Sequence, residues 1–176
     1  MGRIVNLFAG PGVGKSITAA ALFAELKYRG HNTELVLEFA KDAAWEGRGP
    51  DFFAAQTYIT GQQTYRIHRV IDKVEFVITD GPVLQSIAYV TEDYKAQSLK
   101  HVIREHHDSD ESINILLKRT MPYDPNGRYQ NAETALLVDE VIHDMLIEQG
   151  VIFTMLDMSR DTPFQIIEIM KNHGWL

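Results

Sequence analysis

A glycine-rich loop between an apolar run and a helical pattern constrains this chain more than any other feature. Residues 3–9 form an apolar run that predicts a buried strand, and a helical pattern begins directly after the loop and continues to Tyr28. Gly10, Gly12 and Gly14 permit positive φ angles and a close approach of backbone N–H groups to a ligand. The sequence therefore predicts a strand–loop–helix unit that can surround an anion.

The loop sequence AGPGVGKS, residues 9–16, fits the Walker A pattern with alanine in place of its first glycine. The loop N–H groups and the positive end of the helix favour phosphate, Lys15 can reach the β and γ phosphates, and the Ser16 hydroxyl can coordinate Mg²⁺. We therefore expect ATP and Mg²⁺ as cofactors, the alternative being a chance glycine-rich turn. The residues expected to bind ATP are Gly10, Pro11, Gly12, Val13, Gly14, Lys15, Ser16 and Ile17.

Strand and helix patterns alternate along the rest of the chain, which indicates a parallel sheet covered by helices on both faces. Further strands are predicted at residues 33–38, 75–79, 112–117 and 151–156. Further helices are predicted at residues 40–45, 52–73, from Pro82 onward, around 135–146 and at 164–170. Residues 120–130 carry turn residues without an apolar period and predict a loop. No linker or repeat interrupts this alternation, so we expect one domain over residues 1–176.

Charge and composition exclude several classes of protein. The formal net charge is −7 at pH 7, which argues against a protein dominated by nonspecific binding to the DNA backbone. The chain contains no cysteine, so disulfides and thiolate metal sites are excluded. No apolar window approaches the roughly 18 residues of a membrane span, and no signal-peptide core is present. We expect a soluble, cytoplasmic protein without a membrane partner.

Two carboxylates follow predicted strands, at the sheet edge where ligands bind in open α/β folds. Asp80 follows the third strand, where it can hold Mg²⁺ through water or accept a proton from an attacking hydroxyl. Glu38 ends the second strand, where it can act as a general base or bind a substrate hydroxyl, and Asp42 lies one helical turn later. The alternatives are a helix N-cap for Asp80 and a surface position for Glu38. Either carboxylate can be the base.

Arg119 and Arg128 flank the predicted loop after the fourth strand. We expect residues 119–130 to close over ATP as a lid, with both guanidinium groups neutralising charge on the transferring phosphoryl group. The alternative is an ordinary surface connection with two solvated arginines.

A polar and basic stripe lies opposite the apolar face of the helix predicted at residues 52–73, and it is either solvated or part of a substrate site. Trp45 and Tyr65 are candidates for stacking on a base, the alternative for both being the core. The candidate substrate-binding residues are Glu38, Asp42, Trp45, Gln62, Arg66 and Arg69.

The segments GPGVGKS, LEFAKD and ITDGP, the Gln/Arg helix and the loop from Arg119 to Arg128 together resemble a known family. The chain is similar to phage-encoded P-loop kinases related to the ribosylnicotinamide kinase domain of bifunctional NAD-biosynthesis proteins. Such proteins are often described only as ATP-binding or AAA-type. The resemblance covers nearly the whole chain. It implies an α/β P-loop NTPase sandwich of three layers, with a five-stranded parallel sheet in the order 2-3-1-4-5 and a lid loop.

The resemblance also implies ATP-dependent phosphorylation of a nucleoside- or nucleotide-like hydroxyl. One phage branch to which the chain is similar phosphorylates 5-hydroxymethyluracil within DNA, which would take place in the host cytoplasm. Carried over by position, Lys15 and Ser16 hold ATP and Mg²⁺, Asp80 is the acid at the acceptor, and Arg119 and Arg128 form the lid. The chain departs from its relatives at Gly81, where they often have serine. A DNA acceptor would need a basic groove built from some of Arg48, Arg66, Arg69, Lys95, Lys100 and Arg104.

Three functions compete at this point. The first is a kinase acting on a nucleoside-type hydroxyl, either free or within DNA, with Lys15, Asp80, Glu38, Arg119 and Arg128 as catalytic residues. The second is an ATPase or nucleotide-dependent switch that works with a partner protein and needs a water-activating residue and an arginine finger. The third is a noncatalytic nucleotide-binding module, against which the intact phosphate loop counts. The sequence leaves the oligomeric state open.

Overall fold

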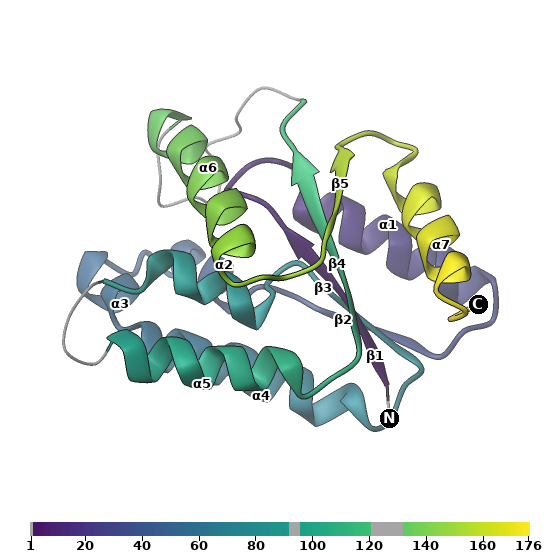
Figure 1. Ribbon diagram of the computed structural model, residues 1–176, viewed down its shortest axis with the longest axis horizontal. Coiled ribbons are helices and arrows are strands. Elements are labelled where there is room, and N and C mark those ends of the chain that lie inside the picture. The colour runs from purple at the N-terminus through teal and green to yellow at the C-terminus, as the bar shows by residue number, and fades with distance from the viewer. Residues whose placement is uncertain (1, 92–95, 121–131) are drawn as a thin grey trace.

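Five strands and the helices between them make up the computed structural model, which describes residues 2–91, 96–120 and 132–176 (Figure 1). The strands are β1 (Arg3–Phe8), β2 (Thr33–Val36), β3 (Phe76–Thr79), β4 (Ser112–Lys118) and β5 (Thr154–Asp157). The helices are α1 (Lys15–Tyr28), α2 (Phe39–Trp45), α3 (Pro50–Ala54), α4 (Gln56–Ile71), the 3₁₀ helix η1 (Val83–Tyr89), α5 (Ala96–Asp108), α6 (Ala132–Glu148) and α7 (Thr162–Asn172). Among these described helices, none combines the length and apolarity needed to cross a membrane.

The sheet is parallel and has the strand order β2-β3-β1-β4-β5, which confirms the expected order. β1 lies at its centre, with Val5 opposite Ile78 of β3 and Ile113 of β4. Because all strands run in the same direction, the loops after β1, β2 and β3 meet at one edge. That edge therefore holds the segments in which the sequence places the site.

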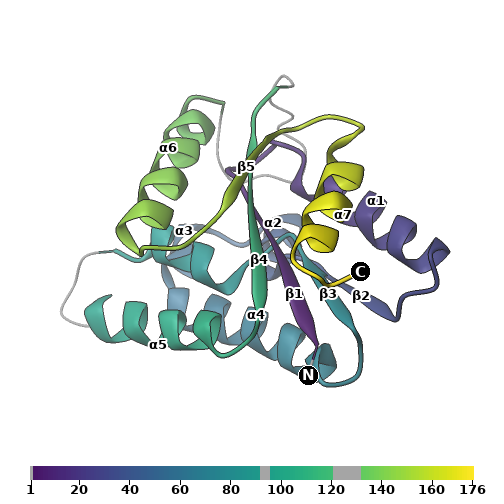
Figure 2. The ribbon, with the colours of Figure 1, turned by 45° about the vertical axis from the view of Figure 1, so that its right-hand side comes forward.

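Helices cover both faces of the sheet, as the turned view shows (Figure 2). Alternate residues of β1 point to opposite layers: Val5 and Leu7 pack with α1 and α7, whereas Ile4 and Phe8 pack with α4, η1, α5 and α6. All four side chains are buried. Apolar residues therefore occupy both faces of β1, because the strand is enclosed on both sides.

The helix expected over residues 52–73 is instead two helices, α3 and α4. Ala55 separates them with a nonhelical ψ of 59°. In a continuous helix the Phe53 carbonyl would accept a hydrogen bond from the next turn, but here it accepts one from the Gln56 side chain at 2.7 Å. Three smaller differences follow: the segment after Pro82 is a 3₁₀ helix, β2 ends at Val36, and β5 begins at Thr154.

Candidate active site

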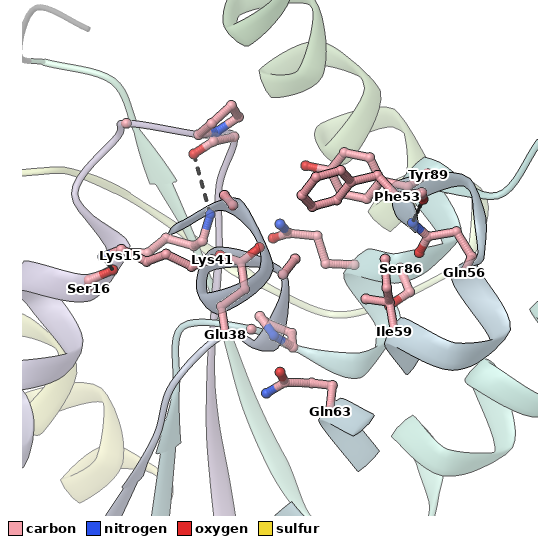
Figure 3. Close-up of a pocket in the computed structure, with 18 residues that line it drawn as sticks. Lys15, Ser16, Glu38, Lys41, Phe53, Gln56, Ile59, Gln63, Ser86 and Tyr89 are labelled. Carbon is pink, nitrogen blue, oxygen red and sulfur yellow. Dashed lines mark hydrogen bonds between the residues drawn. The ribbon is translucent and has the colours of Figure 1, made fainter. Parts of the chain in front are cut away.

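A pocket opens at the carboxyl ends of β1 and β3 and is lined by segments that are far apart in the sequence (Figure 3). The phosphate loop and the start of α1 form one side of it. The start of α2, the α3–α4 junction and the turn and 3₁₀ helix after β3 complete it. The structure therefore joins the phosphate loop to a second compartment within a single cavity.

The phosphate loop has the backbone that its glycines predict. Gly12 and Gly14 have φ angles of 75° and 119°, and α1 begins directly after Gly14. The Lys15 side chain is only 7% exposed, and its ammonium donates to the Ala9 carbonyl at 2.6 Å and to the Gly10 carbonyl at 3.4 Å. The Lys15 ammonium group thus lies at the phosphate loop, within reach of an anion that the loop binds.

Not all residues of the expected ATP-binding set line the pocket. Gly10, Pro11, Gly12, Lys15 and Ser16 do line it. The Val13 side chain is buried in the core between the sheet and α1, and Ile17 is exposed on α1 outside the pocket lining.

Side chains from two other elements hold the phosphate loop in place. The Ala9 N–H donates to Gln85 of η1 at 3.3 Å, and the Gly10 N–H donates to Asp139 Oδ1 of α6 at 3.0 Å. Sequence reasoning missed both residues. The only available signal was the pair of acidic residues, Asp139 and Glu140, between the apolar residues 135–138 and 141–142 of α6.

Arg119 lies beside the phosphate loop. Its Nε donates to Asp139 Oδ2 at 2.8 Å, and its Nη2 donates to the Pro11 carbonyl at 2.8 Å. The guanidinium group therefore links the end of β4 and α6 to the loop. Residues 121–130 of the expected lid, including Arg128, lie outside the described residues.

Asp80 is fully buried at the end of β3. Its Oδ1 accepts the Glu38 N–H at 2.7 Å, while its Oδ2 is buried without a hydrogen-bond partner among the described residues. The N-cap alternative is wrong, because Pro82 precedes η1 and the Gly81 N–H donates to the Thr79 hydroxyl at 3.1 Å. Asp80 instead positions the start of α2 and keeps one carboxylate oxygen for another ligand.

Glu38 is half-buried and lines the pocket from the start of α2. Its backbone is held by Asp80, and the next N–H, that of Phe39, donates to Gln63 Oε1 at 2.8 Å. The structure thus places one carboxylate in the pocket and encloses the other behind it.

The expected substrate residues on α2 and α4 are distributed differently from the prediction. Asp42 and Arg66 form an ion pair at 2.5 Å, and the Arg66 guanidinium lies 5.1 Å from the centre of the Phe39 ring, so this pair fixes α2 on α4. Trp45 is 65% exposed. Of the six candidates, Glu38 alone lines the pocket; Asp42, Trp45, Gln62, Arg66 and Arg69 do not.

The face of α4 that points inward is more polar than the sequence pattern suggested. Gln56, Thr60, Gln63 and Thr64 are buried with Ile59 and Ile67, whereas Tyr65 is exposed, so the core alternative for Tyr65 and Trp45 is wrong. An apolar period alone cannot identify buried amides that pair with backbone groups. Gln63, rather than its neighbour Gln62, is the pocket residue.

The compartment beyond the phosphate loop combines two aromatic rings with amides and a hydroxyl. It is lined by Phe53, Gln56, Ile59, Gln85, Ser86 and Tyr89. Burial raises the pKa of the Tyr89 phenol above its ordinary value, the negative charges of Glu38 and Asp139 raise it further, and a hydrogen bond with Gln85 opposes them. Tyr89 is therefore a neutral hydroxyl at physiological pH, able to donate to a polar ligand.

The residues present fit a magnesium ion held mainly by nucleotide phosphates. Within the described residues no group of three or more histidine and acidic side chains can hold a metal alone. Mg²⁺ typically binds through one or two protein ligands, substrate phosphates and water. Ser16 in the loop and the unpartnered Oδ2 of Asp80 meet that requirement.

Gly81 follows β3 where the chain passes close to the segment after β2, and this close approach leaves no room for a side chain. A Cβ at this position would lie 2.9 Å from Glu38 Cα and 3.1 Å from Gln63 Cδ. We expect Gly81→Ala to lower the free energy of unfolding in urea by about 1–3 kcal/mol, the usual cost of overpacking. A serine at this position would meet the same atoms.

Gly61 provides the control for this experiment. It lies in α4, and a methyl group added to its Cα would meet no atom within 4 Å, so Gly61→Ala should raise stability by roughly 0.5–1 kcal/mol. Equal stability of Gly81→Ala and the wild type would contradict the close approach of β3 and α2.

The family of the chain follows from comparison with known proteins. A family model described as an AAA domain matches residues 4–161, from β1 to beyond β5. The chain belongs to this AAA-domain family. No curated protein sequence gives a significant match to the AAA-domain chain.

Solved structures share the fold of this AAA-domain protein. It is similar to NadR protein in complex with NAD and AMP-PNP, with a TM-score of 0.71, 14% identity, and coverage of 98% of this chain and 50% of that chain. NadR protein in complex with NR gives a TM-score of 0.75 and 12% identity at the same coverage. The chain thus spans about half the length of the NadR chains.

Structures of a second protein match this chain over nearly the whole length of both chains. Deoxyadenosine kinase from M. mycoides with bound dCTP gives a TM-score of 0.63 and 14% identity, with coverage of 97% of this chain and 99% of that chain. At these identities the comparisons show a common architecture, and they confirm the expected P-loop, nucleoside-kinase-like fold.

Proposed function

We propose that this protein is an ATP-dependent kinase that transfers the γ-phosphoryl group of ATP to a hydroxyl of a nucleoside-type acceptor. One observation carries the proposal: the phosphate loop and a polar, aromatic compartment share one pocket. Lys15 and Ser16 lie on one side of this pocket, and Phe53, Gln56 and Tyr89 lie on the other (Figure 3). Such a compartment suits an uncharged ring with hydrogen-bonding groups.

The names of the similar structures support this proposal. NadR has been captured with NR and with AMP-PNP, and the M. mycoides protein is a deoxyadenosine kinase. Both contain a nucleoside or nucleotide site and share the fold of this chain. A water-activated ATPase would have less use for a compartment of this kind beside the phosphate loop.

The chemistry divides between the two sides of the pocket. The loop binds ATP, with Lys15 at the β and γ phosphates. Mg²⁺ would be held by Ser16 and, through water, by Asp80, and would neutralise charge between the phosphates. Glu38 takes the proton of the acceptor hydroxyl as the new O–P bond forms, and ADP leaves with the electrons of the broken bond. We assign the base to Glu38 because Asp80 is enclosed behind the pocket wall.

The finer expectation, 5-hydroxymethyluracil within phage DNA, remains a second form of the same activity. The resemblance to the phage branch supports it, and it requires a basic groove that can bind DNA. Three of the six cations available for that groove, Arg48, Arg66 and Arg104, are ion-paired with Glu46, Asp42 and Asp108. Paired arginines attract phosphates less, so the structure favours a free acceptor. Phage origin and action in a host cytoplasm stay predictions.

One experiment separates these possibilities. The protein is incubated with γ-labelled ATP and Mg²⁺ in the presence of nucleosides, nucleoside monophosphates, or duplex DNA containing 5-hydroxymethyluracil. We expect label to enter a nucleoside-type acceptor and to be absent when Lys15→Ala is used. Labelling of DNA that declines steeply with added salt would instead support the DNA form.

A different result would overturn the kinase. Label released only as free phosphate, at a rate that no acceptor changes, would favour the partner-dependent ATPase or switch. Absence of any ATP consumption with all acceptors would favour the noncatalytic module.

A further inference from the structure

A second lysine, absent from the expected site, reaches the phosphate loop. Lys41 lies on α2, one helical turn after Glu38, and its ammonium donates to the Ser16 hydroxyl at 3.2 Å. Both lysines, Lys15 and Lys41, line the same pocket and lie on its phosphate-loop side (Figure 3). Two cations therefore converge on the place where the loop would hold the outer phosphates.

The position of Lys41 is set by a firmly held helix. The first two N–H groups of the α2 segment, those of Glu38 and Phe39, donate to Asp80 and Gln63 at 2.7 and 2.8 Å. Asp42, which follows Lys41 on α2, is ion-paired with Arg66 of α4. These contacts with the end of β3 and with α4 fix the direction in which Lys41 leaves α2, whereas its own four-carbon stem stays flexible.

The Ser16 hydroxyl cannot serve Lys41 and a divalent cation at the same time. A magnesium ligand lies about 2.0–2.1 Å from its ion, so an ammonium on the same oxygen would face that ion at a repulsive distance. The Lys41 ammonium therefore has to leave Ser16 when nucleotide and metal occupy the loop. Lys41 approaches the loop from α2, on the side of Glu38 and the second compartment, so the phosphate that it would meet is the outermost one.

We propose that Lys41 binds the outermost phosphate of the nucleotide from the acceptor side of the pocket and leaves Ser16 to do so. In this arrangement Lys15 contacts the phosphates from within the loop and Lys41 contacts them from α2. The transferring group is held between the two ammonium groups as it moves toward the acceptor. This inference rests on the proposed binding of ATP.

The proposal predicts that the contribution of Lys41 to nucleotide binding depends on the number of phosphate groups in the nucleotide. ADP lacks the outermost phosphate, so Lys41 should contribute to the binding of ATP and not of ADP. Titration calorimetry of the complete chain with each nucleotide, in the presence of Mg²⁺, measures this difference. We expect Lys41→Met to weaken ATP binding about tenfold or more, the effect of losing one charge-assisted hydrogen bond, and to leave ADP binding within about twofold of the wild type.

Two further variants complete the experiment. Lys41→Arg keeps the charge and should preserve most of the preference for ATP, which a purely structural role for the lysine would not require. Lys27→Met removes an exposed lysine at the end of α1 and should change neither affinity. Thermal unfolding of each variant establishes that it is folded.

The outcomes separate this inference from the proposed function. Equal losses of ATP and ADP affinity in Lys41→Met, or no loss of either, would overturn the role of Lys41 while leaving a wild type that binds ATP as a candidate kinase. A wild type that binds neither nucleotide would overturn both. A selective loss of ATP binding that Lys41→Arg restores would establish the contact.

Discussion

Replacing Lys15 with alanine is expected to lower kcat/KM for phosphoryl transfer by roughly 10²–10³-fold or more, the range found when one preorganised donor to a developing charge is removed. The Lys15 ammonium is enclosed at the loop and bonded to the Ala9 and Gly10 carbonyls, so it is in place before nucleotide arrives. A coupled assay of ADP release with saturating acceptor measures the loss.

Lys27→Ala is the matched control, because it removes a lysine from the same helix at its exposed end. This variant should retain wild-type kinetics. Loss of the Lys15 bonds to the loop also costs stability, so unfolding in urea is followed in parallel. A folded Lys15→Ala protein within tenfold of wild-type kcat/KM would be incompatible with the assigned nucleotide site.

The second large effect is expected for Glu38→Gln. If Glu38 is the base, removing its charge while keeping its shape should lower kcat by about 10²–10⁴-fold, the usual contribution of a general base. ATP affinity should stay unchanged, because glutamine preserves the volume of the side chain, and the backbone N–H that Asp80 holds is unaffected. Single-turnover transfer to the acceptor and calorimetry with ATP measure the two quantities separately.

Glu46→Gln, at the exposed carboxyl end of the same helix, serves as the control and should be fully active. Asp80→Asn gives the contrasting pattern. Asp80 holds the start of α2 and, in the proposed mechanism, supports the metal, so its loss should alter the Mg²⁺ dependence as well as kcat. A Glu38→Gln enzyme with normal turnover would return the role of base to Asp80.

The fold was predictable because the decisive signals are local. The apolar run of β1, the glycines and the start of α1 adjoin one another in the chain, and alternating strands and helices leave few topologies. The break at Ala55 was not predictable in this way, because it is accompanied by a hydrogen bond from the Gln56 side chain to the Phe53 carbonyl. The spacing of apolar residues carries no information about such a hydrogen bond.

The pocket lining was predictable at the phosphate loop and much less so in the compartment beyond it. Lys15 and Ser16 follow from a contiguous motif, and Glu38 and Asp80 follow from strand ends. Lys41, Gln63 and Asp139 depend on tertiary contacts: those of Lys41 and Asp139 bring α2 and α6 to the loop, and that of Gln63 joins α4 to the start of α2. Arg66 and Asp42 were singled out for their charges, but those charges pair with each other.

The bond from Asp80 to the Glu38 N–H makes one carboxylate a member of both half-sites. One of its oxygens sets the position of the proposed base, and the other, which is buried without a hydrogen-bond partner among the described residues, would support the metal through water. Occupancy of either half-site would then change the free energy of the other through a single side chain. By thermodynamic reciprocity, an acceptor that tightens ATP binding is itself bound more tightly, by the same factor, when ATP is present.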